Sequence, residues 1–148
     1  MSQSNASVLL VDDEIAFVET MAKRLTKRVL AVEMAFSGME ALKKLDKSGP
    51  SRTDVVILDV KMPGMDGLKT LAAIKEAHPQ IEVIMLTGHA TVETAIEGMK
   101  SGAFDFFMKP CEIDLLLAKV DEAVSKKRAH EAKILEARMR LHELKRWS

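Results

Sequence analysis

Five short apolar segments recur along the chain, and this repetition limits the fold more than any other feature. Each segment has five or six residues and is followed by a longer stretch whose apolar residues have helical spacing. The five segments are 7–11, 31–35, 54–58, 81–86 and 103–107. Such segments suit strands that are buried on both faces of a sheet. Strands that alternate with helices indicate an α/β fold, so we predict a doubly wound, five-stranded parallel sheet with helices on both faces.

The composition is that of a globular protein. Of the 148 residues, 47% are hydrophobic and 30% are charged, and no apolar stretch approaches the length of a membrane span. The first seven residues lack the basic and apolar regions of a secretion signal. Cys111 is the single cysteine, which excludes an intrachain disulfide and suits a reducing compartment. We therefore expect a cytoplasmic protein.

The charge is divided unevenly along the chain. Residues 126–148 contain eight basic and three acidic residues, whereas the preceding part contains 14 basic and 19 acidic ones. An acidic body and a basic tail suggest two parts with different roles. We expect a domain at 5–125 and a helical extension at 126–148.

Polar residues that could form a site follow four of the predicted strands. They are Asp12 and Asp13 after the first strand, Asp59 after the third, Thr87 after the fourth and Lys109 after the fifth. In open parallel sheets, ligands bind outside the carboxyl ends of the strands. These residues are therefore candidates for one shared site.

The three carboxylates would repel one another if the first and third strands were neighbours. A hard divalent cation with oxygen ligands would offset this repulsion. Mg²⁺ suits such a site because it accepts a few protein ligands together with waters and phosphate oxygens. The ammonium of Lys109 and the hydroxyl of Thr87 would complete a pocket of the size of a phosphate group.

With their neighbours, these residues resemble the receiver domain of two-component response regulators. The matching features are the acidic pair Asp12-Asp13, Asp59 at the end of DVVILD, the loop 62–67, Thr87, and Lys109-Pro110. The resemblance covers residues from about 8 to 124, and five motifs in order are far more specific than any one alone. It implies a flavodoxin-like fold with strand order 2-1-3-4-5 and a cis bond before Pro110.

The resemblance also implies a phosphorylation-activated signalling switch. Asp59 would accept a phosphoryl group from a histidine kinase or a phosphotransfer protein, and Thr87 and Lys109 would contact that group. The Mg²⁺ ligands would be Asp12, Asp13, Asp59 and the backbone carbonyl of Lys61. Such a domain catalyses its own phosphoryl transfer and dephosphorylation, and it is not an enzyme that acts on a separate substrate.

A switch mechanism is implied as well. Thr87 would move toward the phosphoryl group, and Phe106 would rotate into the space that Thr87 leaves. This movement would change the face built from the fourth helix, the fifth strand and the fifth helix. An output protein or an output domain would respond to the change.

Several residues have simpler interpretations. Glu14 and Asp66, taken singly, are better explained as solvated residues or helix caps, because carboxylates favour the first turn of a helix. Thr87 could simply end a strand, and Phe106 could simply belong to the core, so both alternatives stay open. Cys111 suits a small packed apolar side chain.

A helical pattern without Gly or Pro runs from Glu112 to about Trp147. At ~1.5 Å per residue, such a helix projects well beyond the sheet. Its heptad core positions are Ile113, Leu116, Val120, Ala123, Lys127, His130, Ile134, Ala137, Leu141 and Leu144, apolar at both ends and polar in the middle. Two interpretations stay open: a charged, partly frayed tail, or a helix that links to another domain or forms a homodimer.

Other function classes fit less well. A haloacid-dehalogenase-like phosphatase would need a second Asp two residues after Asp59, where this chain has Lys61. No glycine-rich nucleotide-binding loop follows the first strand. A DNA-binding regulator stays open through the basic tail, but the tail lacks a helix-turn-helix, so a nucleic acid is disfavoured as a partner of this chain. No membrane partner is expected, because no apolar stretch is long enough to span one. A phosphorylation-independent pseudo-receiver is disfavoured because the acidic, hydroxyl and lysine residues are all present.

Overall fold

The computed structural model describes residues 6–28, 31–48 and 53–147, in which five strands and five helices alternate. The strands are β1 (Ser7–Val11), β2 (Ala31–Ala35), β3 (Val55–Leu58), β4 (Glu82–Thr87) and β5 (Asp105–Met108). The helices are α1 (Ile15–Thr26), α2 (Gly38–Ser48), α3 (Gly67–Ala77), α4 (Val92–Lys100) and α5 (Ile113–Trp147).

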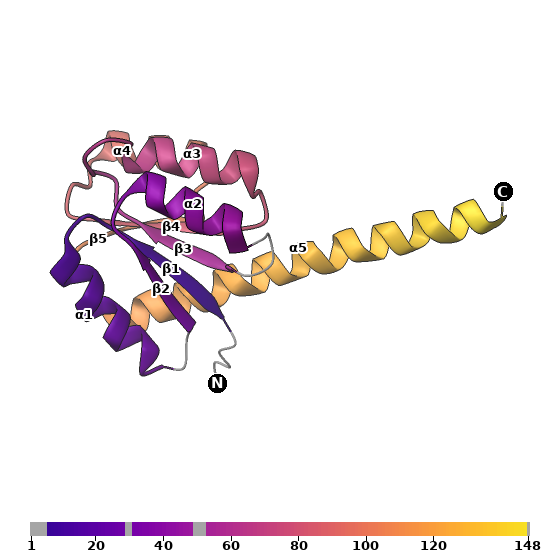
Figure 1. Ribbon diagram of the computed structural model, residues 1–148, viewed down its shortest axis with the longest axis horizontal. Helices are drawn as coiled ribbons and strands as arrows, with labels where there is room; N and C mark the ends of the chain where they lie inside the picture. Colours follow the sequence, from indigo (N-terminus) through magenta and orange to yellow (C-terminus); the bar gives the residue numbers. More distant parts are fainter. Residues whose placement is uncertain (1–5, 29–30, 49–52, 148) are drawn as a thin grey trace.

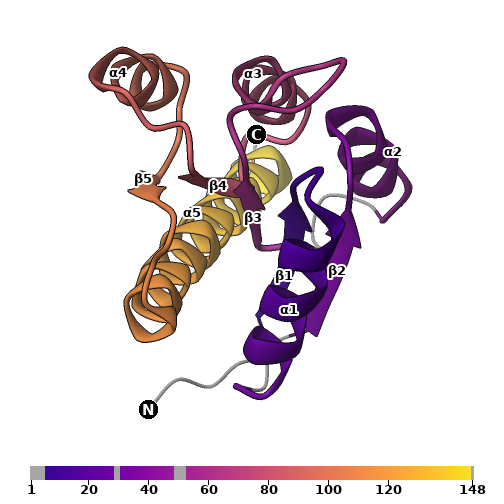
Figure 2. The same ribbon diagram turned by 90° about the vertical axis from the view of Figure 1, so that its left-hand side faces the viewer.

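The strands form one sheet in the order β2-β1-β3-β4-β5, and every neighbouring pair is parallel. Helices α2, α3 and α4 cover one face of the sheet, and α1 and α5 cover the other (Figures 1 and 2). The predicted doubly wound fold and its strand order are therefore confirmed.

The central strands are apolar throughout because both of their faces are covered. All four residues of β3 and all six of β4 are buried. Leu10 and Ile57 pack in the core that α1 and α5 cover, whereas Leu9 and Val56 pack in the core on the α2 and α3 side. The edge strand β2 is less buried, which explains its weaker apolar pattern.

The fifth strand begins two residues later than predicted. Gly102 has a left-handed φ of +104°, and the N–H of Ala103 bonds to the carbonyl of Gly98 in α4. That N–H therefore closes the end of the helix and does not join the sheet. Residues 103 and 104 belong to the connection between α4 and β5, and their apolar character alone did not distinguish them from the strand.

Helix α5 runs continuously to Trp147 and projects far beyond the sheet, as Figure 1 shows. Its buried residues are Leu116, Val120, Ala123, Val124 and Lys127. The long helix predicted from the sequence is confirmed. Within the described residues, no helix is long and apolar enough to cross a membrane.

Candidate functional site

Asp12 and Asp59 lie side by side at the carboxyl edge of the sheet. Val11 of β1 pairs with Leu58 of β3, so the next residue of each strand emerges at the same level. The N–H of Asp59 bonds to the carbonyl of Val11 at 3.0 Å, and the N–H of Asp12 bonds to that of Ala35 at 3.2 Å. Both aspartates are only 3% exposed. The sheet thus holds two carboxylates together in a buried position.

The loop after Asp59 passes very close to the start of α3. A Cβ atom added at Gly67 would lie 1.8 Å from the carbonyl oxygen of Asp59, so only glycine fits here. The N–H of Gly67 bonds to the carbonyl of Val60 at 2.7 Å. Asp66 caps α3 by accepting a bond from the N–H of Lys69 at 2.9 Å, which confirms its interpretation as a helix cap.

Lys109 reaches the aspartates from the end of β5. Its Nζ donates to Asp12 Oδ2 at 2.5 Å and to Glu14 Oε1 at 2.9 Å. The ammonium also lies 4.1 Å from the centre of the Phe17 ring, within the range of a cation–π contact. The bond between Lys109 and Pro110 is cis, as the resemblance implied.

The charges of the site influence one another. Burial raises the pKa of Asp12, the nearby Asp59 raises it further, and bonds from Lys109 and the Glu14 N–H only partly oppose these effects. Burial alone would lower the pKa of Lys109, but its bonds to Asp12 and Glu14 more than offset this and raise it. The bond from Lys109 lowers the pKa of Glu14. Lys109 therefore stays an ammonium ion beside an excess of acidic groups.

The site suits a divalent cation. Asp12, Glu14 and Asp59 each offer one carboxylate oxygen, and these oxygens lie within 4.8 Å of one another. Asp59 Oδ1 is buried and has no hydrogen-bond partner. A buried acceptor without a partner costs free energy, and an oxygen-binding cation would supply one. The donor atoms therefore fit a hard ion such as Mg²⁺.

The acidic residues differ in part from those predicted. Asp13 is exposed and outside the group formed by Asp12, Glu14 and Asp59. Glu14 precedes α1, but its side chain makes no capping bond and turns to Lys109 instead. Glu14 was expected to be a solvated residue or a helix cap, so its contact with Lys109 was not predicted. Its position two residues after Asp12 was the available signal.

Comparisons with known proteins agree with this geometry. The family model of the response regulator receiver domain matches residues 8–121. The chain is a receiver domain of the response-regulator family.

Curated relatives and solved structures support the assignment. The transcriptional regulatory protein ZraR of Klebsiella oxytoca is 35% identical over 92% of this chain and 30% of its own length. The DNA-binding transcriptional regulator NtrC of Klebsiella pneumoniae is 39% identical over 78% of this chain and 24% of its own length. A receiver domain from Clostridium thermocellum has a TM-score of 0.78 and 34% identity, covering 84% of this chain and 98% of that one. The chain thus spans a quarter to a third of these two curated relatives.

Thr87 ends β4 and is completely buried in this receiver. Its Oγ1 accepts a bond from the N–H of His89 at 3.0 Å, and its carbonyl accepts one from the N–H of Lys109 at 2.9 Å. The hydroxyl proton is left to donate elsewhere. Thr87 therefore connects the end of β4 both to the loop before α4 and to the lysine of the site.

Phe106 is half-buried on the face of the receiver that α4 covers. A Cβ atom added at Gly98 would lie 3.5 Å from the Phe106 ring, so the ring lies against the backbone of α4. Phe104 and Phe107 pack with the core on the opposite face. Phe106 is thus the phenylalanine of this segment that contacts α4.

The receiver exposes large apolar side chains on α4, β5 and α5. They include Val92, Ile96 and Met99 of α4, Met108 of β5 and Leu115 of α5, with exposures between 47% and 77%. These residues belong to the three elements of the predicted signalling face. Exposed large apolar side chains are a feature of protein interaction surfaces.

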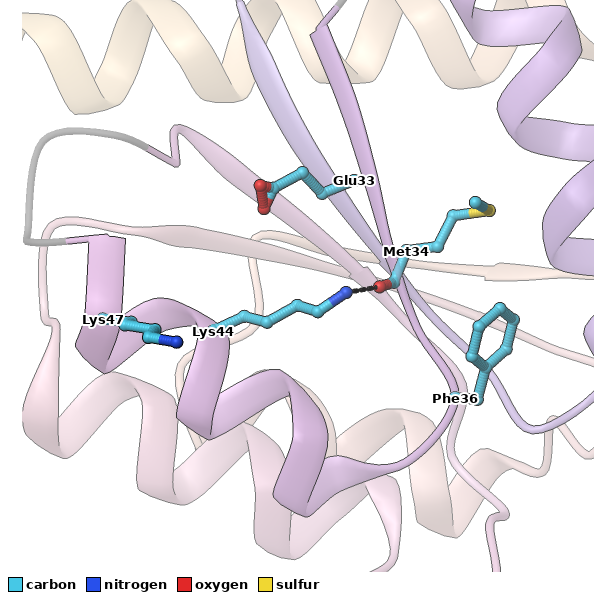
Figure 3. Close-up of a pocket in the computed structure, with 5 residues that line it drawn as sticks. All are labelled: Glu33, Met34, Phe36, Lys44 and Lys47. Atoms are coloured by element: carbon cyan, nitrogen blue, oxygen red, sulfur yellow. Dashed lines mark hydrogen bonds between the residues drawn. The ribbon is translucent and has the colours of Figure 1, made fainter.

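A separate pocket of about 510 Å³ lies between the edge strand β2 and α2 (Figure 3). It is lined by Glu33, Met34, Phe36, Lys44 and Lys47, none of which belongs to the carboxylate site. Figure 3 shows Lys44 reaching across from α2 to donate a hydrogen bond to the carbonyl of Met34. This bond occupies an acceptor on the open edge of the sheet, which indicates a structural role.

Proposed function

We propose that Asp59 accepts a phosphoryl group from a histidine kinase or a phosphotransfer protein, and that phosphorylation switches the surface formed by α4, β5 and α5. The observation that carries the proposal is the buried, unpartnered Oδ1 of Asp59, next to Asp12, Glu14 and the ammonium of Lys109. This arrangement supplies a carboxylate acceptor, ligands for a cation and a positive charge for a phosphoryl oxygen.

In the proposed transfer, a carboxylate oxygen of Asp59 forms a bond to phosphorus while the bond from phosphorus to the donor's imidazole nitrogen breaks. The leaving imidazole takes up a proton. Little covalent chemistry is required of the receiver, so its task is to position the reactants and offset their negative charge. Lys109 is placed for this because its ammonium already contacts Asp12. In the separate hydrolysis step, water would attack the phosphorus, the bond to the Asp59 oxygen would break, and inorganic phosphate would leave from the same group of residues.

Mg²⁺ would be held by Asp12, Asp13, Asp59 and the backbone carbonyl of Lys61, following the resemblance to the family. The geometry adds Glu14 as a fourth carboxylate candidate. When bound, the ion would offset the charge of the carboxylates and of the incoming phosphoryl oxygens. Asp13 is exposed, so its carboxylate would have to turn inward to take part.

The switch would start at Thr87. Its hydroxyl would donate to one oxygen of the phosphoryl group, whose charge of about −2 is spread over three acceptor oxygens. The bond that Thr87 accepts from His89 connects this movement to the loop before α4. Phe106 lies against α4 and would rotate as Thr87 moves, which would change the exposed apolar residues of α4 and β5.

The partner of this surface would be an output protein or an output domain. The curated relatives named above are transcriptional regulators, and the chain spans only part of their length. We propose the division into a receiver at 5–125 and an extension at 126–148. Residues 5 and 148, the outer limits of these parts, lie outside the described residues.

A second copy of the chain is a further candidate partner. Beyond Lys127, the helix exposes Leu135, Met139, Leu141, Leu144 and Trp147 by 54% to 85%. Ile134, Leu141 and Leu144 continue the heptad positions predicted from the sequence. Sedimentation across concentrations, with and without phosphorylation, tests this proposal; identical monomeric behaviour throughout would exclude it.

Mass spectrometry of the intact protein tests the main proposal. We expect acetyl phosphate with Mg²⁺ to add one phosphoryl group to the wild type and none to Asp59→Asn. Asp66→Asn is the matched control, because it removes the charge of a half-buried carboxylate that caps α3. Equal labelling of Asp59→Asn and the wild type would exclude Asp59 as the acceptor. No labelling by acetyl phosphate or by a panel of phosphorylated histidine kinases would favour a pseudo-receiver.

A further inference from the structure

We propose that Asp54 and Lys127 form a buried ionic joint that fixes the direction in which α5 leaves the domain. The joint lies at the amino end of the sheet, opposite the phosphoacceptor site. It does not depend on phosphorylation of Asp59, and its function is to make the second half of α5 a rigid arm. The arm is defined here as residues 128–147.

Asp54 is a fixed point of the sheet. Its N–H bonds to the carbonyl of Ser7 at 2.9 Å, and its carbonyl accepts a bond from the N–H of Glu82 at 3.2 Å. Asp54 Oδ2 accepts a further bond from the N–H of Ser7 at 2.9 Å. Main-chain bonds to β1 and β4 therefore hold this carboxylate in place, with only 6% of the residue exposed.

Lys127 brings its charge into the same buried region. It is 1% exposed, and its Nζ lies 3.1 Å from Asp54 Oδ1 and 3.2 Å from Glu131 Oε2. A buried ammonium ion is costly unless it is paired, so α5 is stable in this position only while Lys127 meets Asp54. The pair therefore selects one orientation of α5 against the sheet. Asp54 lies within residues 8–121, where the family model matches, and Lys127 lies beyond them.

Residues on either side of Lys127 strengthen the joint. Lys126 Nζ lies 3.5 Å from Glu82 Oε2, and Arg128 lies 3.6 Å from Asp54 Oδ2. Glu82 begins β4 and is 4% exposed. Three consecutive basic residues of α5 thus face two buried carboxylates, one directly before β3 and one at the start of β4. One contact alone would allow α5 to pivot, whereas contacts to two strands define its direction.

The joint also explains the polar break in the heptad pattern. Lys127 occupies a core position of that pattern, but it is covered by the chain's own sheet and is not available to a partner helix. Beyond it, Leu141 and Leu144 stay exposed because the arm is held away from the domain. Whatever binds the arm therefore meets it at a fixed orientation relative to the sheet.

Electron paramagnetic resonance distances between α2 and the arm test the joint. Spin labels are placed by Lys43→Cys and His142→Cys on a Cys111→Ser background, with excess unlabelled protein to suppress signals between molecules. We expect one narrow distance distribution in this parent protein. We expect Lys127→Met and Asp54→Asn each to at least double the width of the distance distribution. The distribution of the double variant should be no broader than that of either single variant.

Arg140→Gln is the control, because it removes an ion pair with Glu136 at 2.7 Å that lies wholly within the arm. Its distribution is expected to match that of the parent. Amide spectra of the β1 and β4 residues show whether each variant is folded. Asp54→Asn retains an acceptor for the N–H of Ser7, so it provides the test if Lys127→Met does not fold. Unchanged widths in folded joint variants, or a parent distribution as broad as theirs, would overturn the proposal.

Discussion

Lys109 Nζ contacts Asp12 Oδ2 at 2.5 Å, although the two residues are 97 positions apart in the sequence. The contact occurs where three parallel strands end, at β1, β3 and β5. Lys109 satisfies Asp12 and Glu14 but leaves Asp59 Oδ1 without a partner. The site therefore leaves Asp59 open to a cation or a phosphoryl group.

Removal of Lys109 should strengthen Mg²⁺ binding while weakening phosphorylation. The ammonium lies within 2.9 Å of two carboxylates and competes with a divalent ion for them. We expect Lys109→Met to lower the Kd for Mg²⁺ by about tenfold, equivalent to about 1.4 kcal/mol, in calorimetric titrations. We expect the same variant to incorporate phosphate from acetyl phosphate more slowly. Lys69→Met, at an exposed position of α3, is the control and should change neither the Kd for Mg²⁺ nor the rate of phosphorylation. A weaker Mg²⁺ affinity in Lys109→Met would show that the ammonium and Mg²⁺ do not compete for the carboxylates.

Neutralising Asp59 should stabilise the fold when Mg²⁺ is absent. Asp59 is buried beside Asp12, and its charge contributes to the raised pKa of that residue. We expect Asp59→Asn to raise the free energy of unfolding by about 1 kcal/mol in urea titrations with a chelator present. Saturating Mg²⁺ should reduce or reverse this difference in stability between the variant and the wild type, because the carboxylate of Asp59 binds Mg²⁺ strongly and the amide of the variant does not. A loss of stability with the chelator would mean that Asp59 is not under repulsion.

Gly67 should be essential to the shape of the site. A Cβ atom at this position would lie 1.8 Å from the carbonyl oxygen of Asp59, so α3 and the loop after β3 would have to separate. We expect Gly67→Ala to lower the free energy of unfolding by about 3 kcal/mol and to slow phosphorylation. Gly88→Ala is the matched control, since its Cβ would meet no atom within 4 Å. Equal stability of the two variants would contradict the close approach.

Cys111 should react slowly with alkylating reagents at neutral pH. Burial raises the pKa of its thiol above the usual value, and the charge of Glu112 raises it further. Because the thiolate is the reactive form, the iodoacetamide rate should rise about tenfold per pH unit between pH 7 and pH 8. Glu112→Gln should increase the rate at pH 8. A rate that levels off below pH 9 would show that the pKa is not raised.

The sequence alone determined the fold class and most of the site. The apolar segments are continuous because the central strands are covered on both faces, and that pattern is local and visible along the chain. Parallel strands place their carboxyl ends at one edge of the sheet. A polar residue directly after a strand is therefore expected at that edge, whatever its distance in sequence from the others. This is why Asp12, Asp59, Thr87 and Lys109 could be named before the structure was known.

Only the tertiary structure decided which charged groups meet. Glu14 contacts Lys109 across 95 positions, and Asp54 contacts Lys127 across 73. The first contact depends on the direction of each side chain, and the second also depends on where α5 crosses the sheet. Neither leaves a periodic trace in the sequence. In the heptad pattern Lys127 is only a polar interruption. The fold removes Lys127 and Asp54 from water together. In this buried position each charge stabilises the other.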